Sequence, residues 1–153
     1  MKKSYFVFLV LICSLFAFSS CEFDNSPEPD YPLYVTYTIS AGYTQFTGPD
    51  QLLADIQEWV KANHTIYDKS VHYSTGAASE FANADAEAKV KYNEFLAKFK
   101  AHMTEVQQQL DSGAYGTGIQ VDGQFYVFVA RAQGEGGHIQ SESVSLVYPD
   151  SQS

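Results

Sequence analysis

The first twenty residues of the chain indicate where the protein is directed and which residues remain to form its folded domain. Lys2 and Lys3 precede an uncharged, mostly apolar run of 14 residues at 5–18, and small residues follow at Ser19 and Ser20. This is the three-part layout of a secretory signal peptide. A membrane-spanning helix needs about 18 or more apolar residues. We therefore expect residues 1–20 to be a cleaved signal peptide, with an uncleaved N-terminal anchor as the alternative.

Phe18, Ser19, Ser20 and Cys21 together resemble the lipobox of bacterial lipoproteins. The resemblance implies a thioether-linked lipid on Cys21, cleavage just before this residue, and acylation of the new amino terminus. The serines and the cysteine match the pattern, whereas Phe18 stands where leucine is usual. More than one acyl chain attaches a protein lastingly to a membrane. The resemblance thus predicts a lipid-anchored protein of the cell envelope, in the outer membrane of a Gram-negative cell.

Both cysteines of the chain are accounted for by this prediction. Cys13 would leave with the signal peptide and Cys21 would carry the lipid, so no thiol would remain for a disulfide, a metal site or a nucleophile. A Cys13–Cys21 bridge is the alternative, and it requires that the leader be retained. We expect the body to be stabilised by an ordinary hydrophobic core.

Residues 21–32 are rich in proline and acidic side chains, which predicts an extended, semi-rigid tether that reaches about 30 Å at ~3.1 Å per residue. Acidic residues close behind Cys21 also resemble the surface-export signal of some Gram-negative lipoproteins. Without Lys2 and Lys3 the chain has 7 basic and 18 acidic side chains, a charge of −11. This charge argues against nucleic acid as a partner and against a body lying flat on anionic lipid. The membrane would be contacted through the lipid anchor alone.

Residues 33–153 are long enough for a single domain with one modest core. Apolar and polar residues alternate over 33–40, which predicts a half-buried strand that ends at Ala41-Gly42. A helix is expected at about 49–62, with Thr47 as its N-cap. Its core-facing residues recur at helical spacing: Leu52, Leu53, Ile56, Trp59 and Val60.

The second half of the domain contains the clearest helical pattern, at about 80–111, where apolar residues recur every three or four positions. Residues 64–79 show poor alternation, and the sequence leaves open whether they form a strand. Asp122-Gly123 predicts a two-residue hairpin turn, followed by a central strand at 125–130. A second turn is expected at 134–137, before a last strand that turns Val144, Leu146 and Tyr148 inward.

These elements predict an α+β domain. We expect a mostly antiparallel sheet of 4–5 strands with two helices, at about 49–62 and 80–111, packed on one face.

No catalytic motif is present, and the sequence predicts neither a catalytic residue nor a cofactor nor a metal. Two pairs have the spacing seen in metal motifs: His102 with Glu105, and Glu135 with His138. Each is set aside because a metal site needs further convergent ligands that the sequence does not identify.

The one positive indication of a binding site is aromatic. Tyr34, Thr36 and Thr38 lie on the less apolar side of the first strand, and without a covering helix they would form a flat platform for a glycan or an envelope protein. The alternative is that tyrosine is simply a good strand former. We therefore predict a non-catalytic, membrane-anchored binding or accessory module of unknown oligomeric state. The alternatives are an inhibitor of a hydrolase, acting through its acidic surface, and a small hydrolase whose site only the fold assembles.

Overall fold

The computed structural model describes residues 32–72, 77–132 and 137–149. Four strands and two helices follow one another as β1 (Pro32–Thr47), α2 (Asp50–Asn63), β2 (Thr65–His72), α3 (Ala77–Asp111), β3 (Val121–Arg131) and β4 (Gly137–Tyr148). The strands form one antiparallel sheet in the order β2-β1-β3-β4. The predicted α+β class, with two helices on a four-stranded antiparallel sheet, is confirmed.

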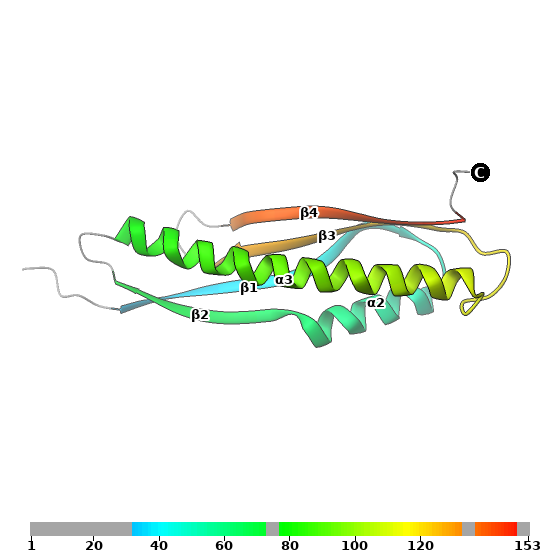
Figure 1. Cartoon of the computed structure of the whole chain (residues 1–153), viewed down its shortest axis with the longest axis horizontal. Helices are drawn as coiled ribbons and strands as arrows, with labels where there is room; N and C mark the ends of the chain where they lie inside the picture. The colour runs from blue at the N-terminus through cyan, green and yellow to red at the C-terminus, as the bar shows by residue number, and fades with distance from the viewer. Residues whose placement is uncertain (1–31, 73–76, 133–136, 150–153) are drawn as a thin grey trace, which may run out of the picture.

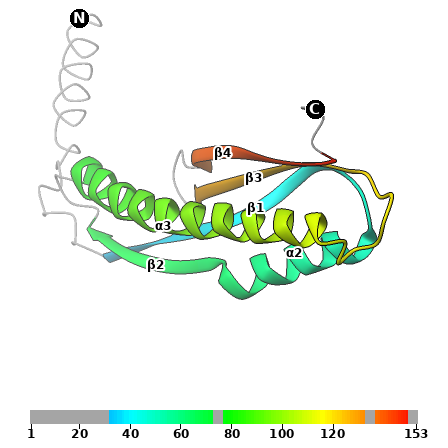
Figure 2. The same ribbon diagram turned by 45° about the vertical axis from the view of Figure 1, so that its right-hand side comes forward.

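Both helices lie on the same face of the sheet, and α3 runs along its full length (Figures 1 and 2). The apolar stripe of α3 packs onto the sheet as its spacing predicts. The stripe residues that the sequence identified are all buried: Tyr92, Phe95, Leu96, Phe99, Met103, Val106 and Leu110.

The core lies between α3, α2 and the inward face of the sheet. β1 supplies Val35, Tyr37 and Ile39 to it, as the predicted alternation requires, and β3 supplies Phe125, Val127 and Val129. From α2, Leu52 and Ile56 are buried, while the predicted Leu53, Trp59 and Val60 are partly buried against the same cluster.

The prediction that the first strand ends at Ala41-Gly42 is wrong, because β1 continues to Thr47. Gly42 lies opposite Tyr126 of β3, and a Cβ on Gly42 would stand 2.6 Å from the Tyr126 hydroxyl oxygen. The ring of Tyr126 therefore leans across β1 over Gly42. This glycine makes room for an aromatic ring inside a strand and does not end it.

The predicted hairpin at Asp122-Gly123 is also wrong, because both residues lie inside β3. They are paired on both sides, with Thr47 and Phe46 of β1 and with Val147 and Leu146 of β4. A Cβ on Gly123 would stand 2.7 Å from Cε2 of Phe125 and 3.1 Å from Cδ2 of Phe46. Gly123 thus permits close packing of two rings in the core.

Thr47 does not cap α2. Pro49 occupies the N-cap position with no side-chain hydrogen bond, and its carbonyl oxygen accepts from the amide of Leu52 at 3.1 Å. Thr47 is instead the last residue of β1, where it is paired with Asp122 of β3.

The segment that the sequence left open contains β2, which pairs with the first half of β1. The predicted second turn at 134–137 lies outside the described residues except for Gly137, where β4 begins. In β4, Leu146 is buried and Val144 and Tyr148 are partly buried against the core, as predicted.

Candidate functional site

The three predicted site residues lie together on the side of β1 that faces away from the helices. The register places Tyr34, Thr36 and Thr38 at alternate positions, and Ser40 continues the row. Tyr34 is 62% exposed, Thr36, Thr38 and Ser40 are partly exposed, and both described helices lie on the other face of the sheet (Figures 1 and 2). We call this outward side of the four strands the open face.

The open face also carries two aromatic rings that the sequence analysis did not assign to it. Tyr126 and Phe128 of β3 lie opposite Gly42 and Ser40, and their ring centroids are 5.8 Å apart with an interplanar angle of 32°. Because the Tyr126 ring extends over Gly42, it lies along the surface of the sheet. The two rings form an aromatic centre for the open face.

Hydroxyl groups border these rings on both sides. On one side are Ser40 and Thr38 of β1, and on the other side Ser141 and Ser143 of β4 lie opposite Phe128 and Tyr126. The row continues to Ser145, whose hydroxyl donates to Oε1 of Gln124 at 3.0 Å. Hydroxyls at these positions can donate or accept hydrogen bonds toward a bound molecule.

The centre of the open face is uncharged. Every residue directly opposite the two rings is neutral: Ser40, Gly42, Ser141 and Ser143. Two acids lie farther out: Asp68, which accepts a 2.7 Å hydrogen bond from Thr36, and Asp122 near the other end of β3. A chain with a net charge of −9 therefore presents a neutral surface at this place.

The covered face, by contrast, contains a cluster of charged and polar groups. The hydroxyl of Tyr37 donates to Oδ1 of Asp85 at 2.7 Å, and Nη1 of Arg131 lies 3.1 Å from both carboxylate oxygens. Burial, with the hydrogen bond to Asp85 next, raises the pKa of Tyr37 well above its ordinary value of 10.0. The cluster connects α3 to β1 and β3. Its groups bind one another, so we assign it a role in holding the helix on the sheet.

His102 and Glu105 lie near each other on α3. Nδ1 of His102 lies 3.8 Å from Oε2 of Glu105, and the imidazole stacks on Trp59 with ring centroids 4.7 Å apart. Burial lowers the pKa of His102, against a smaller opposing effect of Glu105. Within the described residues no group of three potential ligands could hold a metal ion. The side chains of the other pair, Glu135 and His138, are not among those that the structure describes.

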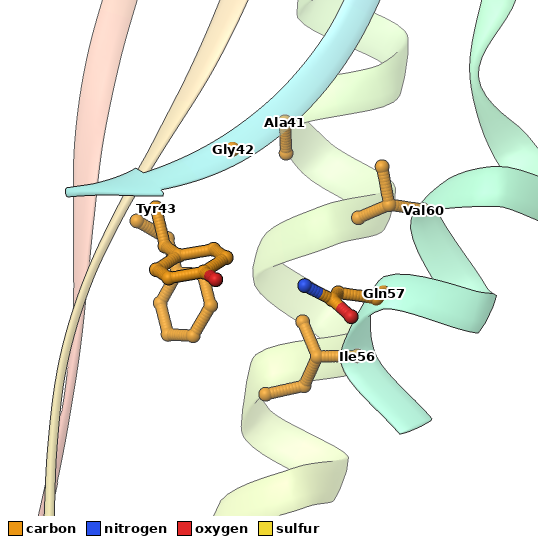
Figure 3. A pocket seen from close by; sticks show the side chains of 7 residues that line it. Ala41, Gly42, Tyr43, Ile56, Gln57 and Val60 are labelled. Carbon is orange, nitrogen blue, oxygen red and sulfur yellow. The ribbon is translucent and has the colours of Figure 1, made fainter. Parts of the chain in front are cut away.

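A small cavity lies on the covered side, between the second half of β1 and α2 (Figure 3). Its volume is about 140 Å³. Tyr43 and Gln57 are exposed residues at its rim, and the remaining lining is mostly apolar: Ala41, Gly42, Ile56, Val60 and Phe125. Sequence analysis could not identify this cavity, since its walls come from three separate elements.

The predicted signal peptide, Cys21 and the predicted tether as far as residue 31 lie outside the described residues. Pro32, predicted as the last residue of the tether, is instead the first residue of β1. Of the helices in the described ranges, none is both long and apolar enough to cross a membrane.

Comparisons of the chain with protein-family models, with curated proteins and with solved structures give no significant match.

Proposed function

We propose that this protein is a lipid-anchored, non-catalytic envelope module that binds a neutral glycan on the open face of its sheet. The observation that carries the proposal is the pairing of two aromatic rings with flanking rows of hydroxyls on a face that no described helix covers. The apolar side of a sugar ring stacks on an aromatic ring, while its hydroxyls exchange hydrogen bonds with hydroxyl and amide groups nearby.

The distribution of charge supports a neutral ligand. The chain as a whole is acidic, so it repels anionic molecules at long range. At the centre of the open face, the residues opposite Tyr126 and Phe128 offer no cation to offset that repulsion. A neutral sugar chain is not repelled by the net negative charge of the protein.

The predicted lipid on Cys21 and the tether at 21–32 complete the proposal. They would hold the body at the membrane surface and leave the sheet free to meet polysaccharide outside the cell membrane.

The small-hydrolase alternative gains no support from the cavities. Neither the cavity between β1 and α2 nor the shallow depression along α2 is lined by two carboxylates, which glycoside hydrolysis ordinarily requires.

The test is binding of the detergent-solubilised, full-length protein to an array of neutral and anionic polysaccharides. We expect binding to neutral members that changes little with added salt. Tyr126→Ala should weaken it by about five- to ten-fold, the loss of roughly 1 kcal/mol of stacking. Tyr43→Ala is the matched control, because it truncates a partly exposed tyrosine beside the cavity on the covered side.

Preference for anionic members, or equal weakening by both substitutions, would reject the open face as the site of glycan binding. Strongly salt-sensitive inhibition of a basic hydrolase would instead favour the inhibitor alternative.

A further inference from the structure

The second half of β1 is flanked by a helix where its first half is flanked by a strand. β2 pairs with β1 from Pro32 to Ile39, and α2 continues the line of β2 beside residues 40–47 (Figures 1 and 2). Ala41 lies between this part of β1 and α2 and has only a methyl group to fill the space. The cavity of about 140 Å³ results (Figure 3).

The volume of this cavity suits one small ring. An engineered apolar cavity of about 150 Å³ holds a single benzene molecule. Because α2 lies where a further strand would lie, the space beside residues 40–47 does not admit a polypeptide segment. The occupant that fits is therefore a small molecule.

The walls of the cavity favour an aromatic ring. Figure 3 shows the ring of Tyr43 on one side of the cavity and Ile56 and Val60 of α2 on the other. The ring of Phe125 also lines it, with its centroid 6.4 Å from that of Tyr43 and an interplanar angle of 57°. Aromatic rings in such tilted arrangements attract one another beyond the effect of burial alone. A bound ring would join this pair.

The rim of the cavity supplies one polar group that lacks a partner. Gln57 is exposed, and its side chain points into the space between α2 and β1 (Figure 3). No described residue forms a hydrogen bond with its amide group. The lining of the cavity contains no charged side chain. A ligand with one neutral hydrogen-bonding group would match this rim.

We propose that the cavity between β1 and α2 binds a neutral phenol, a molecule with one aromatic ring and a hydroxyl group. The ring occupies the space between Tyr43 and α2, and the hydroxyl group exchanges a hydrogen bond with the amide of Gln57. An anionic ring compound would find no cation in the lining, and the net charge of −9 would repel it.

This site is separate from the proposed glycan site, because the cavity and the rings of Tyr126 and Phe128 lie on opposite sides of β1. Either proposal can fail without the other. Tyr126→Ala, which should weaken glycan binding, should leave the binding of phenol intact.

The test uses the detergent-solubilised, full-length protein and three probes: phenol, benzene and benzoate. NMR titration follows the methyl signals of Ala41, Ile56 and Val60, so a probe that enters only the detergent micelle is not counted as bound. We expect phenol and benzene to shift these signals. Benzoate should bind at least about ten-fold more weakly than phenol, because its charge would be buried without a partner.

The role of Gln57 is measured by comparing phenol with benzene in each variant. Gln57→Leu should lower the ratio of the phenol affinity to the benzene affinity about five-fold, the effect of one hydrogen bond. Gln51→Leu makes the same change at an exposed position of α2 outside the lining and should keep the ratio. The ratio cancels changes that affect both rings alike.

The role of the cavity itself is measured by filling it. Ala41→Leu should abolish the shifts of Ile56 and Val60 with both phenol and benzene. Ala101→Leu adds the same atoms at an exposed position of α3 and should preserve the shifts.

Four outcomes overturn the proposal: no shift of the cavity signals with phenol, benzoate binding as tightly as phenol, an unchanged ratio in Gln57→Leu, or undiminished shifts in folded Ala41→Leu. The first three come from the wild-type protein and from the exchange of an exposed side chain, so the test does not depend on the folding of Ala41→Leu.

Discussion

Phe125 and Tyr126 are neighbours in β3, yet their surroundings are opposite. Phe125 is 3% exposed and contacts the ring of Phe99 in α3, with centroids 6.1 Å apart. Tyr126 occupies the next position, so its ring lies on the opposite face of the sheet, over Gly42, and is partly exposed. Successive side chains of a strand point to opposite faces, so the covering helices alone decide which ring belongs to the core. The comparison teaches that the covered face supplies stability, whereas the open face is free to bind.

The largest effect should come from the covered face. Phe99→Ala removes a fully buried ring that packs between Trp59 and Phe125. We expect the free energy of unfolding to fall by about 3–5 kcal/mol. Val90→Ala, on the exposed side of the same helix, should change it by no more than about 0.5 kcal/mol. Urea denaturation measures both, and similar losses in the two variants would contradict the assignment of the faces.

Two glycine substitutions, one on each face of the sheet, compare how tightly the two faces are packed. In Gly123→Ala the new methyl group meets two rings of the core, so we expect a loss of about 1–3 kcal/mol. In Gly42→Ala it meets only the outer end of the Tyr126 side chain, which can tilt away into solvent, so the loss should stay below about 1 kcal/mol. Gly42→Ala should nevertheless weaken glycan binding, because it displaces the ring. A larger loss of stability in Gly42→Ala than in Gly123→Ala would reverse the comparison.

The last stability prediction concerns the cluster of Tyr37, Asp85 and Arg131 on the covered face. Tyr37→Phe removes the hydrogen bond to Asp85 and should cost about 1–2 kcal/mol near neutral pH. The pKa of Tyr37 is raised in the folded state, so the unfolded chain loses this proton first as pH rises above about 10. The stability of the unmodified protein should therefore decline from that pH upward.

Tyr37→Phe should decline less steeply over the same range, since it lacks this titrating group. Tyr34→Phe, which removes the hydroxyl of a ring that is 62% exposed, is the control. Urea denaturation at pH 8, 10 and 11 compares the three proteins. An unchanged slope in Tyr37→Phe would show that this hydroxyl does not control the alkaline transition.

The sequence predicted the elements whose pattern is local. The stripe of α3 repeats with the helical period from Tyr92 to Leu110, and the first residues of β1 alternate cleanly, so the buried side and the row with Tyr34, Thr36 and Thr38 follow directly. The sequence left open whether residues 64–79 form a strand, because polar and apolar residues do not alternate in β2 as they do in a typical half-buried strand. Lys69 points inward and binds Glu87 of α3 at 2.6 Å, while Ile66 points outward and is 60% exposed.

The rings of the open face were missed for another reason. Residues 125–130 are apolar at every position, so their period does not distinguish one face from the other. Gly42 and Gly123 were interpreted as the end of a strand and as a turn, although each accommodates an aromatic side chain. Such contacts join residues of β1 and β3 that lie far apart in the sequence, and local turn preferences contain no information about them.

Chemical-shift mapping of the full-length protein in detergent, with the strongest neutral glycan from the array, tests the central claim most directly. We predict that the signals that move belong to Ser40, Tyr126, Phe128 and Ser143, and that those of Tyr43 and Gln57, which border the cavity, stay in place. Shifts confined to α2, α3 or the cavity, or the absence of any neutral glycan that binds, would contradict the account.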